Sequence, residues 1–137
     1  FGPLDGDIRS RIAASGHADR IHLTADLAGA EAMQGFDMLV MPSRYEAMSY
    51  VMLEAAACGL PMILTSVGGA TTVVEDGANG FIVPNDDDVT VLEQAMRMAC
   101  KPECLAALAQ SASARRWSYS LEAMVTETER LYRSLSR

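Results

Sequence analysis

Short apolar runs alternate with stretches of helical periodicity along most of the chain. Four runs have the length and composition of strands, near residues 20–24, 37–41, 61–65 and 80–83. Near-continuous apolar runs of this kind are typical of parallel strands that are covered on both faces. Apolar positions three or four apart predict helices over residues 4–15, 28–35, 50–58, 89–100 and 120–135, with a further helix beginning at Pro102.

The order of these elements predicts the class of fold. Strands that alternate with helices across short loops indicate an α/β domain, with a Rossmann-like parallel sheet and flanking helices. Because four strands are few for a doubly wound sheet, we expect the sheet to be incomplete at its N-terminal side, with about one or two strands before Phe1. The length of 137 residues suits one domain rather than two. We therefore predict a single partial domain over residues 1–137, with C-terminal helices from about residue 89 to residue 137.

Composition and charge narrow the classes of function. Half of the residues are hydrophobic and 21% are charged, as in a globular domain. The net charge of −7 argues against a nucleic-acid partner, because such proteins gather Lys and Arg on one face. The three cysteines, Cys58, Cys100 and Cys104, lack the even count and dense spacing of a disulfide framework, which indicates reduced thiols. Cys100 and Cys104 also lack the further ligands that a zinc site needs, so no metal site is predicted.

The sequence also bears on location. No apolar run approaches the roughly 18 residues that a membrane-spanning helix needs. Arg115 and Arg116 form a short basic pair, which would support only weak contact with a membrane surface. We expect a cytoplasmic protein whose membrane association, if any, is peripheral and at the inner membrane face.

The segment with the most chemistry is the polar loop over residues 41–49, between a predicted strand and a predicted helix. Ligands of open parallel sheets bind beyond the carboxyl ends of the strands. The first N–H groups of a helix have no internal partners and lie at the positive end of the helix dipole. We therefore expect the backbone from Ala47 through Met48 and Ser49 to Tyr50 to bind a diphosphate.

Two glutamates flank this helix start. Glu54, about one turn into the helix, is placed to accept hydrogen bonds from the adjacent hydroxyls of a ribose. Glu46 stands in the loop ahead of the helix and is placed to reach a sugar next to the diphosphate. A structural interpretation stays open, because an acidic residue near a helix start favours the dipole and an exposed helical Glu is usually only solvated.

A longer pattern carries a family resemblance. It comprises Glu46 and Glu54 separated by seven residues, then Ala55, Gly59 and Pro61, followed by Val67-Gly68-Gly69, Val74-Glu75-Asp76-Gly77 and Asn79-Gly80-Phe81-Ile82-Val83-Pro84. This series resembles the motifs of the group 1 (family 4) retaining glycosyltransferases. Weaker matches extend to Gly2-Pro3-Leu4 upstream and to Trp117 and Tyr132 downstream.

The resemblance implies one half of a GT-B architecture, in which two Rossmann-like domains face a cleft, and this chain resembles the C-terminal, donor-binding half. It implies that Glu54 holds the nucleotide ribose, that Glu46 is the catalytic residue beside the donor sugar, and that the backbone from Ala47 to Tyr50 contacts sugar and phosphates. It also implies transfer with retention of configuration and no cofactor or metal. Ala47 and Met48 depart from the family pattern, which usually has Gly followed by an aromatic residue.

Two further features have open interpretations. Gly68 and Gly69 are candidates for close approach to a ligand, or for a loop that requires a positive φ. Arg44 could attract a phosphate, or be an ordinary solvated side chain.

We therefore expect the full-length protein to be a hexosyltransferase-like glycosyltransferase of polysaccharide or glycoconjugate biosynthesis. Its partners would be a nucleoside diphosphate sugar and a glycan or lipid-linked acceptor, the latter held by an N-terminal domain. Residues 1–137 alone are expected to be inactive, because the family's phosphate-pairing Arg and Lys would lie before Phe1. The alternative is a non-catalytic nucleotide-sugar-binding module, and no motif supports a GT-B epimerase or phosphorylase.

Overall fold

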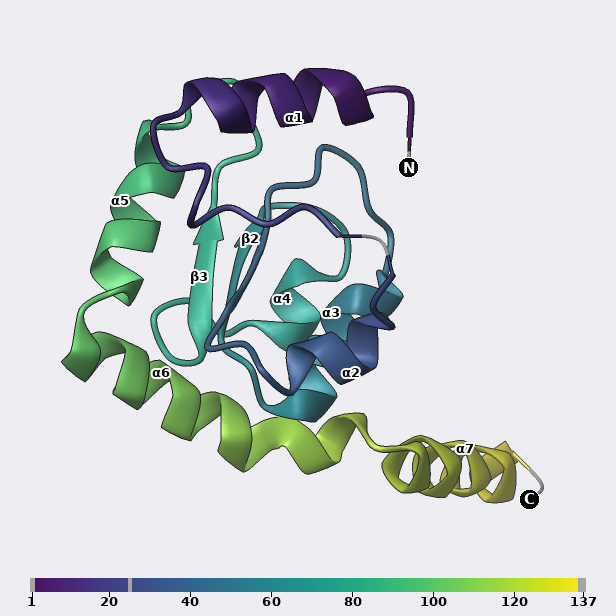
Figure 1. Ribbon diagram of the computed structural model, residues 1–137. Coiled ribbons are helices and arrows are strands. Elements are labelled where there is room, and N and C mark those ends of the chain that lie inside the picture. Colours follow the sequence, from purple (N-terminus) through teal and green to yellow (C-terminus); the bar gives the residue numbers. More distant parts are fainter. Residues whose placement is uncertain (1, 25, 136–137) are drawn as a thin grey trace.

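A computed structural model describes residues 2–24 and 26–135. Its centre is a parallel sheet of three strands, β1 (Leu39–Met41), β2 (Met62–Thr65) and β3 (Gly80–Val83), in the order β1-β2-β3 (Figure 1). Val40 pairs with Ile63, which in turn pairs with Phe81. The α/β class and the parallel sheet predicted from the sequence are confirmed.

The central position of β2 in the sheet explains why its sequence is almost entirely apolar. All four of its residues are buried. Because successive side chains of a strand point to opposite faces, Met62 and Leu64 pack into one hydrophobic cluster and Ile63 packs into the other. The sheet is therefore covered on both faces, as the apolar run predicts.

Short helices cover one face of the sheet. They are α2 (Gly29–Met33), α3 (Tyr50–Cys58) and α4 (Ala70–Val73), and each contributes buried residues to the cluster of Met62 and Leu64. The longest of them, α3, begins after the cap residue Ser49 and ends at Gly59, whose φ of 73° is left-handed. Glycine is suited to that position because it has no Cβ to clash.

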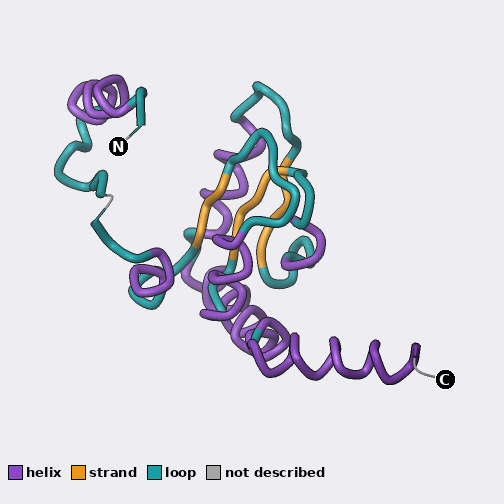
Figure 2. The backbone as a smooth tube through the Cα atoms, turned by 90° about the vertical axis from the view of Figure 1, so that its right-hand side faces the viewer, coloured by secondary structure: helices purple, strands orange, loops and turns teal. Residues whose placement is uncertain are grey.

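Helices α5 (Thr90–Ala99) and α6 (Pro102–Arg115) cover the other face through Ala95, Ala99 and Leu108, which pack around Ile63. The chain continues through a short 3₁₀ helix, η1 (Arg116–Tyr119), into α7 (Leu121–Leu135). Figures 1 and 2 show α7 extending away from the sheet, and none of its described residues is buried. These helices match the predicted ones within two residues at most ends.

The N-terminal segment differs from the prediction. Helix α1 (Asp5–Ala14) forms where expected but lies apart from the sheet, without a buried residue (Figure 2). Residues 21–24, predicted as a strand, have no regular structure. The prediction of a strand there is wrong: the outer edge of β1 is unpaired in the described chain, but residues 21–24 form no hydrogen bond with it. A β-branched and apolar composition makes a strand only where neighbouring backbone completes its hydrogen bonds.

Candidate functional site

The loop over residues 42–49 connects the carboxyl end of β1 to the first turn of α3, as the sequence predicts. Its last residue, Ser49, has an extended backbone, and its hydroxyl oxygen accepts a hydrogen bond from the Val51 N–H at 3.2 Å. Such a side-chain cap fixes where the helix begins. The loop thus delivers its residues to the positive end of α3.

Backbone N–H groups at this helix start are free of protein acceptors. Within the described chain, the N–H groups of Ala47, Met48, Ser49 and Tyr50 have no hydrogen-bond partner, whereas those of Val51 and Leu53 are taken by Ser49. The group predicted to bind a diphosphate is therefore available to an external acceptor. Free N–H groups together with the helix dipole form the usual setting for a bound anion.

Three carbonyl oxygens of the loop accept hydrogen bonds from the end of β2 and from the chain after β2 and β3. The Thr65 hydroxyl donates to the Ser43 carbonyl at 2.5 Å, and the Gly68 N–H donates to the Glu46 carbonyl at 3.0 Å. From the β3 side, the Asn85 side-chain amide donates to the Arg44 carbonyl at 2.8 Å. The position of Glu46 is thus set by contacts with the end of β2 and with the chain after β2 and β3.

The two loop glycines have distinct reasons for being glycine. A Cβ on Gly68 would lie 2.6 Å from the Glu46 carbonyl oxygen and 2.7 Å from that of Ala47. Gly69 has a left-handed φ of 81°, and a Cβ there would lie 2.9 Å from the Ala47 carbonyl oxygen. Both glycines therefore let the loop after β2 pack directly against the loop over residues 42–49, called here the Glu46 loop. This packing explains the presence of glycine at both positions without a ligand.

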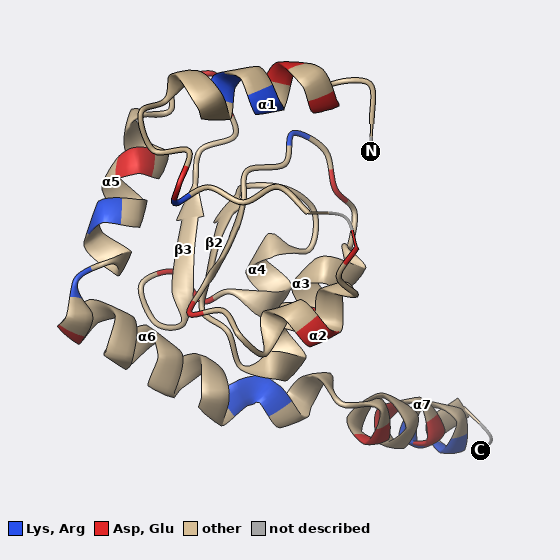
Figure 3. Cartoon of the chain, viewed as in Figure 1, with Lys and Arg blue, Asp and Glu red and all other residues tan. Residues whose placement is uncertain are grey.

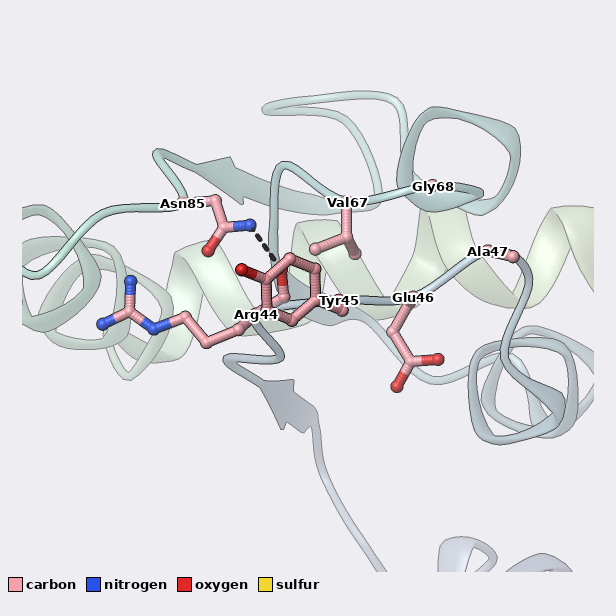
Figure 4. A pocket seen from close by; sticks show the side chains of 7 residues that line it. All are labelled: Arg44, Tyr45, Glu46, Ala47, Val67, Gly68 and Asn85. Carbon is pink, nitrogen blue, oxygen red and sulfur yellow. Dashed lines mark hydrogen bonds between the residues drawn. The ribbon is translucent and has the colours of Figure 1, made fainter.

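The two loops enclose an open pocket of about 610 Å³ (Figure 4). Its walls are formed by Arg44, Tyr45, Glu46, Ala47, Val67, Gly68 and Asn85. Glu46 is half-buried, and its Oε1 accepts a hydrogen bond from the Ser43 hydroxyl at 3.3 Å. In Figure 4 its carboxylate points away from the side of the pocket where Arg44 and Asn85 lie. Of the predicted site residues, the pocket gathers Glu46, Ala47 and Gly68.

Glu54 lies elsewhere, on α3 and outside the pocket lining. It is half-buried, and its Oε2 would lie 3.4 Å from a Cβ built on Gly29, the first residue of α2. The carboxylate thus lies beside the start of α2, in agreement with the separate places predicted for Glu46 and Glu54. The contact with Gly29 has no signal in the sequence, because the two residues belong to different elements.

The remaining predicted residues also lie outside the pocket lining. Tyr50 is exposed at the start of α3, and Ser49 serves as its cap. The sulfur of Met48 lies against Gly69, only 2.9 Å from where a Cβ of that glycine would stand. Ala47 has no positive φ, since the described non-glycine residues include none with that conformation. Alanine in place of the family's glycine is therefore accommodated without left-handed backbone.

Arg44 is neither a free phosphate ligand nor a freely solvated side chain. Its guanidinium donates to the Asp86 carbonyl at 2.6 Å and forms an ion pair with Asp87. The next carboxylate, Asp88, accepts a hydrogen bond from the Thr90 N–H at 2.9 Å. Hydrogen bonds from the side chain and the backbone of Thr90 lower the pKa of Asp88. The loop over residues 85–88 is thus tied to the Glu46 loop at one end and to α5 at the other.

Val67 belongs to the motif Val67-Gly68-Gly69, whereas Tyr45 and Asn85 are pocket residues to which the sequence assigned no role. The available signal for Asn85 is that its polar side chain follows β3 and Pro84. Figure 3 shows that Lys and Arg are spread over the chain, on α1, α5, the end of α6, α7 and several loops, rather than gathered on one element.

Comparison with known proteins places the chain in a family. Residues 2–101 match the model of the glycosyl transferases group 1. The chain therefore belongs to this family, and the resemblance drawn from its motifs is confirmed.

Relatives and solved structures agree with this assignment. Alpha-D-kanosaminyltransferase of Streptomyces kanamyceticus is 28% identical over 138 aligned positions, which cover 98% of this chain. Sucrose-phosphate synthase of Thermosynechococcus elongatus is 27% identical, with a TM-score of 0.79 over 98% of this chain. Anabaena Alr3699/HepE is 24% identical, with a TM-score of 0.75 over 99% of this chain, and shares the fold. The fold is therefore part of a GT-B architecture, as predicted.

This chain spans about a third of each of these proteins: 36% of the kanosaminyltransferase, 35% of the synthase chain and 38% of the HepE chain. Among the described residues, no helix has the length and apolarity to cross a membrane. Nor do three His, Cys, Asp or Glu side chains gather there as a metal site would require. The prediction that no cofactor is needed is not tested by these findings.

Proposed function

We propose that this chain is the donor-binding half of a glycosyltransferase, which transfers a sugar from a nucleoside diphosphate sugar to an acceptor with retention of configuration. The observation that carries the proposal is the run of four free backbone N–H groups, Ala47 to Tyr50, at the start of α3. It stands between two half-buried carboxylates, Glu46 before the helix and Glu54 within it.

The order of these groups along the chain supports a linear arrangement of subsites. Glu54, whose carboxylate lies beside Gly29, accepts hydrogen bonds from the ribose hydroxyls. The free N–H groups bind the diphosphate at the positive end of the helix. Glu46, on the pocket side, orients the donor sugar.

The relatives support the nature of the donor. Anabaena HepE was solved in complex with UDP-glucose. The two other relatives are named as a kanosaminyltransferase and a sucrose-phosphate synthase. A nucleoside diphosphate sugar fits the chemistry of this site, because its diphosphate is an anion and its ribose and sugar are rich in hydroxyls.

The chemistry proposed is mainly electrostatic. Negative charge develops on the diphosphate as the bond to the sugar breaks, and fixed N–H dipoles stabilise that charge without reorganisation. No metal is assigned to the site. We assign the acceptor, a glycan or a lipid-linked one, to a facing N-terminal domain, and we place the protein in the cytoplasm with at most peripheral membrane contact.

A second candidate is a nucleotide-sugar-binding module without catalysis. The observation that favours it is the Glu46 loop itself, where Ala47 and Met48 depart from the family pattern and Arg44 is engaged by Asp86 and Asp87. Such a module would bind the donor and release no product.

Incubation of the full-length protein with uridine, guanosine and adenosine diphosphate sugars separates the two candidates. We expect release of nucleoside diphosphate from at least one donor class in the presence of cell-extract glycans. Tight donor binding without any release favours the module. The absence of both binding and release contradicts the proposed function.

A further inference from the structure

Asn85 joins the chain after β3 to the loop over residues 42–49, and the proposed function assigns it no role. It stands just beyond the carboxyl end of β3, and its Nδ2 donates to the carbonyl of Arg44, 41 positions earlier in the chain. Arg44 returns the contact, because its guanidinium donates to the Asp86 carbonyl and pairs with Asp87. We call this reciprocal contact the Asn85–Arg44 clasp.

The clasp differs from the other supports of the Glu46 loop. The carbonyls of Ser43 and Glu46 are held by Thr65 and Gly68, which both belong to the end of β2 and the chain after it. Among the residues that the structure describes, only the clasp ties the backbone of this loop to the β3 side. Without it, the loop would be held along one side alone.

The clasp also acts close to the proposed chemistry. The carbonyl that Asn85 holds belongs to Arg44, two residues before Glu46, and all three residues line the same pocket (Figure 4). Asn85 itself is exposed, so its amide is not needed to complete the hydrophobic core. Its hydrogen bond therefore bears on the place of the loop more than on the stability of the fold.

We propose that Asn85 is a positioning residue, which sets the place of Glu46 relative to the donor sugar through the carbonyl of Arg44. This inference rests on the proposed function. In the described structure Asn85 forms no hydrogen bond with Glu54 or with the free N–H groups of Ala47 to Tyr50. Its loss is therefore expected to lower turnover while donor affinity is preserved, since small misplacements of a reacting group cost rate rather than binding.

The test uses Asn85→Asp in the full-length protein. This change keeps the shape of the side chain but replaces the donor amide by an ionised oxygen, which repels the Arg44 carbonyl. Asn85→Gln keeps the donor amide and serves as the conservative variant. Gln94→Glu, on the exposed surface of α5, controls for the added negative charge. Turnover and the dissociation constant for UDP-glucose are measured for each, together with hydrogen exchange of the peptide over residues 43–48.

For Asn85→Asp we expect turnover to fall about tenfold or more, the dissociation constant to stay within about twofold, and exchange over residues 43–48 to accelerate. Asn85→Gln should retain most of the turnover and Gln94→Glu all of it. Unchanged turnover and exchange in Asn85→Asp overturn the inference and leave the proposed function intact. An equal loss of affinity and turnover also overturns it, because Asn85 would then belong to the donor site itself. A wild-type protein that neither binds nor turns over any nucleotide sugar overturns the proposed function and this inference together.

Discussion

The N–H of Gly68 donates to the carbonyl oxygen of Glu46 at 3.0 Å, and a Cβ on Gly68 would stand only 2.6 Å from that same oxygen. The loop after β2 is therefore in direct backbone contact with the loop that carries the proposed catalytic carboxylate. Gly68 therefore has no room for a side chain at this point. The contact shapes the pocket, because Gly68, Glu46 and Ala47 all line it.

Gly68→Ala is expected to disturb both the fold and the site. The added methyl group must push the Glu46 and Ala47 carbonyls apart, which typically costs about 1–3 kcal/mol of unfolding free energy. Turnover should fall with it, since Glu46 moves. Urea unfolding and donor turnover of the full-length protein check both effects.

Gly6→Ala is the matched control. Gly6 lies within α1, and nothing stands within 4 Å of a Cβ built there. This change should leave turnover unaltered and is expected to stabilise α1 by up to about 1 kcal/mol through helix propensity. If Gly68→Ala has the unfolding free energy and the donor turnover of the wild type, the loop after β2 and the loop over residues 42–49 do not need their close contact.

The sequence predicts those helices and strands that are set by residues close together in the chain. It fails where a strand depends on pairing with a distant segment. Helix α3 and its end at Gly59 follow from apolar spacing and from a glycine that adopts a left-handed φ. Strand β2 follows from a continuously apolar run. The strand expected at residues 20–24 does not form, because strand pairing depends on where the chain lies in space, and these residues do not pair with the open edge of β1.

The same distinction applies to the site. The free N–H groups from Ala47 to Tyr50 could be predicted, because any helix start leaves such groups. The clasp of Asn85 with Arg44 could not, since it spans 41 positions and uses side-chain geometry. Gly68 was recognised as special, but its reason, the backbone of Glu46, becomes visible only when β1 and β2 are paired side by side.

Asn79 gives a prediction about stability that is independent of function. It is only 3% exposed, its Nδ2 donates to the Val73 carbonyl at 2.9 Å, and its Oδ1 accepts from the Glu75 N–H at 2.7 Å. Asn79→Ala leaves both backbone groups without this partner and is expected to cost about 1–3 kcal/mol for each group that stays unsatisfied. Gln34→Ala, which removes an exposed amide, should change the unfolding free energy by less than about 0.5 kcal/mol. Equal unfolding midpoints for the two variants would contradict this account of Asn79.

Asp88 gives a prediction about pH. Hydrogen bonds from Thr90 lower its pKa in the folded protein. A lowered folded pKa means that the stabilisation is complete above the unfolded pKa, about 3.9, and is lost as the pH falls through the folded value. Asp88→Ala should therefore have a lower unfolding free energy than the wild type at pH 7, and this difference should shrink below about pH 4. Unfolding curves from pH 7 down to about pH 3 measure the difference. A difference that stays constant over this range would refute the role of the ionised carboxylate.

The isolated chain provides a test of the division into halves. If the residues that pair with the diphosphate lie on other parts of the full-length protein, residues 1–137 should bind nucleotides only weakly. Calorimetry with uridine, guanosine and adenosine diphosphates is expected to show dissociation constants in the millimolar range, or no heat. A millimolar dissociation constant corresponds to a binding free energy of only about −4 kcal/mol. Tight binding of any of the three would place the complete phosphate site within this chain.

The central claim is that Glu54 anchors the nucleotide ribose, and it is tested most directly in the full-length protein with Glu54→Ala. Calorimetry with UDP-glucose and turnover measured at saturating donor are compared with those of Glu103→Ala, which changes an exposed glutamate in the first turn of α6. Since hydrogen bonds to a charged group contribute about 1.5–3 kcal/mol, we predict a dissociation constant raised about tenfold to a hundredfold for Glu54→Ala and unchanged for Glu103→Ala. Donor affinity and turnover that are both unaltered in Glu54→Ala would contradict the account.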